Sequence, residues 1–238
     1  MSAFAIAFDV GTLEQALALD ERLGPGPEVA KVGLQLFASA GPAAVRALKE
    51  RGRRVFLDLK LHDIPNTVRG AAAAAGALGA DLITVHATGG EEMVRAAVEG
   101  AASAGQGTRV VAVTILTSLD PASLPPGFAR PFDLEATVAA LLELSERAGA
   151  LGIVCSAADL TGLRARRHGR PFFSVTPGIR PGGAPAHDQK RVATVAEAVA
   201  LGADLLVLGR AITAAADPRA ALAAARAERD AALASLQR

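Results

Sequence analysis

One stretch of this 238-residue chain has charges where a buried strand should be apolar, and it reads Arg54-Val-Phe-Leu-Asp58-Leu-Lys60-Leu-His62-Asp63. Successive side chains of a strand point to opposite faces, so Asp58 and Lys60 share one face and the neighbouring leucines share the other. A desolvated ion pair contributes little net stability, and apolar residues often replace it without loss. We therefore expect this pair to serve chemistry rather than folding.

Outward from this stretch, strand-like and helix-like segments alternate along the whole chain. Short apolar runs predict strands at residues 5–10, 29–37, 54–60, 82–86, 110–114, 152–155, 173–176 and 205–208. Stretches rich in Ala, Leu, Arg and Glu predict helices at residues 13–22, 42–51, 67–78, 91–103, 134–147, 158–166, 192–201 and 218–236. Eight strands in 238 residues give about 30 residues per repeat, the usual size of a βαβ unit.

The repeat predicts an α/β protein with one domain over residues 1–238, a single (β/α)8 TIM barrel. No Gly/Ser-rich linker and no change of composition divides the chain. An open doubly wound sheet is the alternative fold. The turn after the first predicted strand, Asp9-Val-Gly-Thr12, lacks the G-x-G-x-x-G fingerprint of dinucleotide sites in such sheets. In a barrel, catalytic groups lie at the C-terminal ends of the strands.

The composition argues against several classes of protein. A formal net charge of +1 and an aromatic content of 3%, with no Trp or Tyr, disfavour nucleic-acid binding. No apolar run approaches the length of about 18 residues that a spanning helix needs, so no membrane segment is expected. The N-terminal segment has no basic region and breaks at Asp9, which favours a first strand over a signal peptide and predicts a cytoplasmic protein.

Metal and disulfide sites are not expected either. The single cysteine, Cys155, has no intramolecular partner, and the four histidines are scattered along the chain. We expect Cys155 to be a small buried apolar residue and the protein to need no metal or other cofactor.

Two neighbouring strands add charges to those of the third. Asp9 follows the first predicted strand and Lys31 lies in the second, so Asp9, Lys31, Asp58 and Lys60 can form an alternating array. The carboxylates would keep each lysine protonated. A protonated lysine is a poor Schiff-base nucleophile but a good proton donor for a developing carbanion. The array therefore favours a reaction that builds negative charge on carbon over a Schiff-base aldolase.

The charged stretch also carries a family resemblance. Residues 58–67, Asp-Leu-Lys-Leu-His-Asp-Ile-Pro-Asn-Thr, resemble the signature of orotidine 5'-phosphate decarboxylases, whose core is Asp-x-Lys-x-x-Asp. Further similar segments lie at residues 8–11, 31–33, 113–118, 175–181, 188–191 and 208–210, from the first predicted strand to the last. The resemblance implies metal-free decarboxylation of orotidine 5'-monophosphate to UMP and CO2, the last step of de novo UMP synthesis.

The same resemblance implies roles for individual residues. Lys60 would protonate C6 of the pyrimidine, beside Asp58 at the departing carboxylate. Lys31 and Asp9 would hold the ribose hydroxyls. Asp63 and Thr67 would reach into the neighbouring subunit's site, which implies an obligate homodimer. Thr117, or alternatively Ser118, would contact the base.

A phosphate site is expected at the ends of the last two barrel strands, where TIM barrels commonly bind phosphate. Arg180 follows predicted strand seven, and Gly209 and Arg210 follow strand eight, with Arg210 the stronger candidate for direct contact. The segment of residues 180–190 is long enough, and its residues small enough, to form a lid. The resemblance implies that Gln189 in this lid bridges the base and phosphate ends of the substrate.

Two other functions remain open. A magnesium-dependent ketose-phosphate decarboxylase or aldolase barrel would need an additional carboxylate cluster, with Glu expected on the second strand. A catalytically silent barrel that binds a nucleotide would have no reason to keep the charged array. His62 and His86 are interpreted as structural, because the mechanism has no place for an imidazole.

Overall fold

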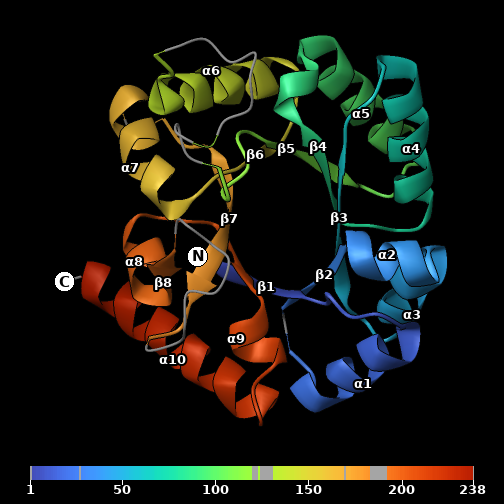
Figure 1. Ribbon diagram of the computed structural model, residues 1–238, viewed down its shortest axis with the longest axis vertical. Coiled ribbons are helices and arrows are strands. Elements are labelled where there is room, and N and C mark those ends of the chain that lie inside the picture. The colour runs from blue at the N-terminus through green and yellow to red at the C-terminus, as the bar shows by residue number, and fades with distance from the viewer. Residues whose placement is uncertain are drawn as a thin grey trace.

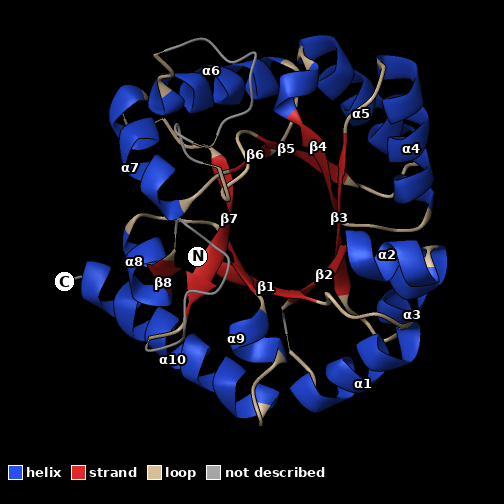
Figure 2. Ribbon diagram, viewed as in Figure 1, coloured by secondary structure: helices blue, strands red, loops and turns tan. Residues whose placement is uncertain are grey.

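Eight parallel strands form a closed barrel inside a ring of helices in the computed structural model (Figures 1 and 2). The structure describes residues 2–26, 28–119, 123, 131–168, 170–182 and 192–237. The barrel strands are β1 Ala3–Ala7, β2 Val29–Gly33, β3 Arg54–Leu61, β4 Leu82–His86, β5 Arg109–Val113, β6 Gly152–Val154, β7 Phe173–Arg180 and β9 Leu205–Leu208. Their order is β6-β5-β4-β3-β2-β1-β9-β7, and pairing of β6 with β7 closes the ring. The TIM barrel prediction is confirmed, and the open sheet is wrong.

Helices surround the barrel, and about half of them begin at a side-chain cap. They are α1 Leu13–Leu23, α2 Leu34–Ala40, α3 Pro42–Glu50, α4 Pro65–Ala77, α5 Glu91–Ser103, α6 Leu134–Arg147, α7 Ala157–Arg166, α8 Val195–Ala200, α9 Arg210–Thr213 and α10 Pro218–Leu236, with a 3-10 turn η1 at Ala87–Gly89. Ser156 forms a capping box with Asp159 at the start of α7, and Thr194 forms one with Glu197 at α8.

Several predicted boundaries are wrong. The strand expected over residues 29–37 ends at Gly33, because the next seven residues, LQLFASA, contain no β-branched side chain and form α2. The first strand ends at Ala7 rather than at residue 10, although the Phe8 N–H still donates to the Lys31 carbonyl at 2.9 Å. The seventh strand extends to Arg180 instead of stopping at residue 176.

Four short elements escaped prediction, the 3-10 turn η1 among them. A two-residue strand, β8 at Ala193–Thr194, pairs with the last residues of β7. The helices α2 and α9 are also additions to the eight expected, and both follow directly on a barrel strand. Because α2 and α9 start at the C-terminal ends of β2 and β9, they bring further side chains to the end of the barrel where a site is expected.

Two apolar layers stabilise the fold. The inner one fills the barrel with Ala5, Ala7, Val29, Phe56, Leu82, Val111, Val113, Val154, Val175, Leu205 and Val207. The outer one lies between strands and helices and takes the alternate residues, such as Val55 and Leu57 of β3. Cys155 is buried in this outer layer, as predicted. The inner layer gives way to charged residues, Lys31 and Asp58, towards the C-terminal ends of β2 and β3.

Among the described residues, no helix has the length and apolar character needed to span a bilayer.

Candidate functional site

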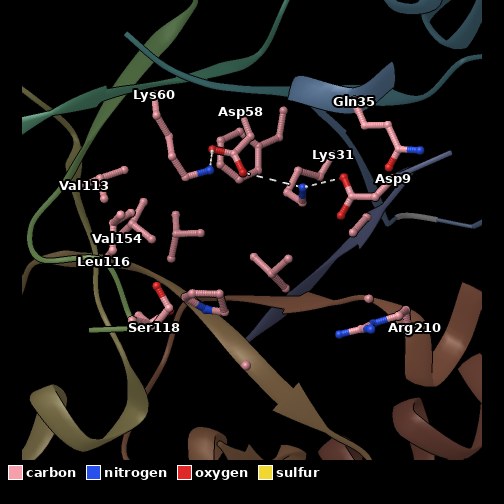
Figure 3. Close-up of a pocket in the computed structure, with 18 of the residues that line it drawn as sticks. Asp9, Lys31, Gln35, Asp58, Lys60, Val113, Leu116, Ser118, Val154 and Arg210 are labelled. Carbon is pink, nitrogen blue, oxygen red and sulfur yellow. Dashed lines mark hydrogen bonds and ion pairs between the residues drawn. The ribbon is translucent and has the colours of Figure 1, made fainter. Parts of the chain in front are cut away.

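A cavity of about 520 Å³ opens at the C-terminal ends of the barrel strands (Figure 3). Its charged lining comes from Asp9, Lys31, Asp58, Lys60, Arg180 and Arg210. Its apolar lining includes Phe56, Val113, Ile115, Leu116, Val154, Val175 and Val207. The cavity is therefore an apolar pocket with a few convergent charges, the usual form of a small-molecule site.

The four charges predicted to form an array do lie together. Lys31 Nζ is 3.1 Å from Asp9 Oδ1 and 3.5 Å from Asp58 Oδ2. Lys60 Nζ is 2.8 Å from Asp58 Oδ1. The charges thus alternate along one wall in the order Asp9, Lys31, Asp58, Lys60. The dashed lines of Figure 3 mark the three contacts between them.

Burial differs along the array. The Lys31 and Asp58 side chains are 9% and 11% exposed, whereas those of Lys60 and Asp9 are 30% and 52% exposed. Burial alone would raise the pKa of Asp58, but the ammonium groups of Lys31 and Lys60, with hydrogen bonds from Lys60 and Thr84, hold that pKa below its usual range. Asp58 is therefore an anion fixed between two cations.

The backbone of β3 is irregular at Lys60. This residue has φ +52°, the left-handed region that costs a non-glycine residue about 1–2 kcal/mol. The β3–β4 register shifts between Leu57 and Leu61, so Lys60 lies in a bulge. The simple alternation expected for this strand therefore does not hold through Lys60, although its side chain still enters the cavity.

Gly33 allows the first two charges of the array to approach the backbone. A Cβ atom at this position would lie 2.6 Å from Asp9 Oδ1 and 3.1 Å from Lys31 Nζ. Any larger residue would therefore displace the Asp9–Lys31 pair.

The opposite wall carries two arginines. Arg180 is buried at the end of β7, and Arg210 begins α9 directly after Gly209. Burial lowers the pKa of Arg180, and the positive charge of Arg210 lowers it further. A Cβ atom at Gly209 would meet nothing within 4 Å, so there is open space in front of its backbone. Two neighbouring cations beside an open space suit an anion such as a phosphate.

The remaining predicted site residues fall into three groups. Thr117 and Ser118 both line the cavity, so the choice between them stays open. Asp63 and Thr67 do not line it; they are exposed just beyond β3 and at the start of α4. Gln189, with the rest of residues 183–191, lies outside the described residues.

Two residues near the array were missed by sequence reasoning. Thr84 is fully buried on β4 and hydrogen-bonds to both Lys60 and Asp58. Its only signal is a hydroxyl at an inward position between the apolar residues Ile83 and Val85. Gln35 lines the cavity near Asp9 (Figure 3), but it could not be placed because α2 was predicted as a strand.

His62 and His86 lie beside the site rather than in it. The rings of His62 and His86 are 5.3 Å apart, and neither residue lines the cavity. Burial lowers the pKa of His86, with smaller contributions from His62 and Lys60. Within the described ranges, no group of three or more His, Cys, Asp or Glu side chains is arranged to hold a metal ion.

Comparison with known proteins agrees with this geometry. Residues 2–225 match the profile of the orotidine 5'-phosphate decarboxylase / HUMPS family. The chain is 55% identical to the orotidine 5'-phosphate decarboxylase of Anaeromyxobacter sp. (strain K) over 216 residues, which cover 90% of this chain and 92% of that protein. It is 47% identical to that of Moorella thermoacetica over 228 residues, 94% of this chain and 90% of that protein.

A solved structure is similar as well. The crystal structure of orotidine 5'-phosphate decarboxylase from Lactobacillus acidophilus superposes with a TM-score of 0.83 at 35% identity, covering 97% of this chain and 100% of that one. The similarity therefore extends over the whole barrel, in sequence and in structure.

Proposed function

We propose that this chain, which belongs to the orotidine 5'-phosphate decarboxylase / HUMPS family, decarboxylates orotidine 5'-monophosphate to UMP and CO2, the last step of UMP synthesis. The observation that carries the proposal is the alternating array of two lysines and two aspartates, which shares a single cavity with two arginines. The relatives that bear this activity in their names match the chain over nearly its full length.

The array suits the hardest part of this reaction. When the C6–carboxylate bond breaks, the electron pair stays at C6 in an orbital that the ring π-system cannot delocalise. Decarboxylases often meet this problem with an electron-sink cofactor. Here Lys60 would stabilise the charge as it forms and pass a proton from Nζ to C6, while CO2 leaves beside Asp58. UMP and a neutral Lys60 amine remain.

The other cavity residues would hold the rest of the nucleotide. Lys31 and Asp9 would bind the ribose hydroxyls, and Thr117 or Ser118 the base. Arg210, Arg180 and the Gly209 N–H would bind the phosphate. A volume of about 520 Å³ lies within the range of sites that enclose ligands of this size.

We also propose a homodimer in which Asp63 and Thr67 complete the partner's site. Both residues are exposed although they closely follow β3, which carries Asp58 and Lys60. Leu34 and Ile64 are 60% and 67% exposed at the same end of the barrel. Exposed apolar side chains of this size, next to polar residues that do not reach their own cavity, are typical of a subunit interface.

The magnesium-dependent function would require a different set of donors. Lys31 places an ammonium between Asp9 and Asp58, where two carboxylates would otherwise be available to a cation. We propose that the reaction needs neither metal nor other cofactor. The chain would act as one barrel domain in the cytoplasm, a compartment in which an unpaired cysteine such as Cys155 is common.

The test is the ultraviolet absorbance of orotidine 5'-monophosphate after addition of EDTA-treated protein. Conversion to UMP at a rate that EDTA does not change supports the proposal. Activity that is lost in EDTA and restored by Mg²⁺ would favour the metal-dependent function. Absence of turnover, with UMP still raising the thermal unfolding temperature, would favour the silent binder.

A further inference from the structure

Thr84, on the neighbouring strand β4, hydrogen-bonds to both Asp58 and Lys60 of β3. Its side chain is completely buried on the inner face of β4. Its Oγ1 accepts a hydrogen bond from the Lys60 backbone N–H at 2.8 Å and donates one to Asp58 Oδ1 at 3.0 Å. Because a hydroxyl has one proton, accepting from Lys60 directs that proton towards Asp58.

This hydroxyl takes the place of a regular strand partner. The β3–β4 register runs from Leu57↔Ile83 to Leu61↔Val85, so β3 contains two more residues than β4 in this interval. The Lys60 N–H lies inside that irregular interval and donates to the Thr84 side chain. A lysine whose backbone is in the left-handed region persists only where the surrounding structure holds it there. The hydrogen bond from the Lys60 N–H to Thr84 is one such restraint.

We propose that Thr84 is a positioning residue of the decarboxylation: its hydroxyl fixes the bulge that aims Lys60 Nζ and, through the same oxygen, orients the Asp58 carboxylate. This inference rests on the proposed function. Asp58 Oδ1 receives both the Thr84 hydroxyl and Lys60 Nζ, so the backbone and the side chain of Lys60 are tied to one carboxylate oxygen. Loss of the hydroxyl would free the backbone of Lys60 and leave Asp58 with one donor fewer.

Asp58 is surrounded by groups from three strands. Lys31 of β2 and Lys60 of β3 form ion pairs with it. His86 of β4 interacts with it more weakly. Asp9 does not contact Asp58 but pairs with Lys31, which lies between the two carboxylates. The Thr84 hydrogen bond also lowers the pKa of Asp58. Its removal would raise that pKa, so activity that needs the carboxylate would fall at a higher pH on acidification.

Two substitutions at this position separate the hydroxyl from the shape of the side chain. Thr84→Val keeps the shape and removes the hydroxyl, whereas Thr84→Ser keeps the hydroxyl. Thr108→Val is the matched control, because Thr108 is also buried and its hydroxyl donates to the Ala80 carbonyl, before the start of β5 and away from the cavity.

We expect Thr84→Val to lower kcat about 10- to 100-fold, the order of loss that a small misplacement of a reacting group causes. KM and the affinity for UMP should stay nearly constant, and the acid limb of the kcat profile should move to higher pH. Thr84→Ser should restore kcat and the acid limb, and Thr108→Val should change neither. An unchanged kcat and acid limb in Thr84→Val would overturn the inference, as would failure of Thr84→Ser to restore them.

Crystal structures of the wild type and Thr84→Val make the outcome independent of turnover. The inference requires Lys60 to leave φ near +52° or its Nζ to move from Asp58. An unmoved Lys60 would overturn it. If the wild type does not convert orotidine 5'-monophosphate while Thr84→Val still displaces Lys60, the proposed function fails, but the structural part of the inference, that Thr84 holds Lys60 in place, is supported.

Discussion

Lys60 Nζ lies 2.8 Å from Asp58 Oδ1, although the backbone of Lys60 leaves the regular strand conformation that Asp58 keeps. The contact therefore depends on a local distortion of β3 and not on strand geometry alone. Such a distortion stores strain, and strain of this kind is concentrated at functional sites.

Replacement of this lysine should separate chemistry from binding. We expect Lys60→Ala to lower kcat by at least about 100-fold, since it removes the proton donor and the charge that stabilises the carbanion. Absorbance assays measure the loss, and calorimetry with UMP measures the remaining affinity. Lys49→Ala is the control, because Lys49 pairs with Asp81 outside the cavity. Retained turnover in Lys60→Ala would contradict the proton-donor role.

The loss of affinity on removing Arg210 should depend on whether the ligand carries a phosphate. Arg210→Ala should weaken UMP binding about 10-fold or more while changing uridine binding little, because only UMP carries a phosphate. Isothermal titration of both ligands tests this. Arg219→Ala, in a residue that does not line the cavity, should leave both affinities unchanged. Equal affinities of the wild type for UMP and uridine would argue against a phosphate site.

Gly33 should be intolerant of even one added carbon. A Cβ atom would meet Asp9 Oδ1 at 2.6 Å, so Gly33→Ala should displace the Asp9–Lys31 pair. The backbone at Gly33 has φ −92°, which alanine adopts readily, and stability should therefore change little. We expect KM for orotidine 5'-monophosphate to rise about 10-fold, as is usual when a charged hydrogen-bonding partner is misplaced. A wild-type KM in Gly33→Ala would contradict this assignment.

Asp58 should contribute to stability with a defined pH dependence. Its pKa lies below the ordinary value of 3.8, so its contribution is present above that pH and is lost as the pH falls through the lowered pKa. The unfolding free energy of Asp58→Asn should therefore be less sensitive to acid than that of the wild type. Urea unfolding between about pH 6 and about pH 3 measures the difference. Parallel pH profiles would show that Asp58 is not held as a stabilised anion.

Hybrid dimers test whether Asp63 acts across an interface. Lys60→Ala and Asp63→Ala should each be nearly inactive alone. After subunit exchange, half of the dimers contain one Lys60→Ala subunit and one Asp63→Ala subunit. In such a dimer, the site of the Asp63→Ala subunit has its own intact Lys60 and receives the intact Asp63 of the other subunit. About one quarter of the wild-type activity should return. If Asp63 acts in its own subunit, no activity returns.

The sequence predicted the parts of the fold that have a clear period. The barrel followed from eight apolar runs, and the inward face of β3 followed from alternation up to Asp58. The Lys60 bulge could not be predicted, because it depends on Thr84 of another strand, 24 residues away along the chain. The α2 helix was missed because its residues directly continue the apolar run of β2. Gln35, which lies in α2, was missed for the same reason. Arg180 lines the cavity from the strand and not from a loop.

The unequal exposure of the two lysines has a consequence for the proton balance. In the proposed reaction, each turnover would leave Lys60 as a neutral amine, and the proton given to C6 would have to be replaced before the next turnover. The Lys60 side chain is 30% exposed and lies within reach of water, whereas the Lys31 side chain is 9% exposed. Water can therefore reach the reacting lysine of the array more readily than the buried one.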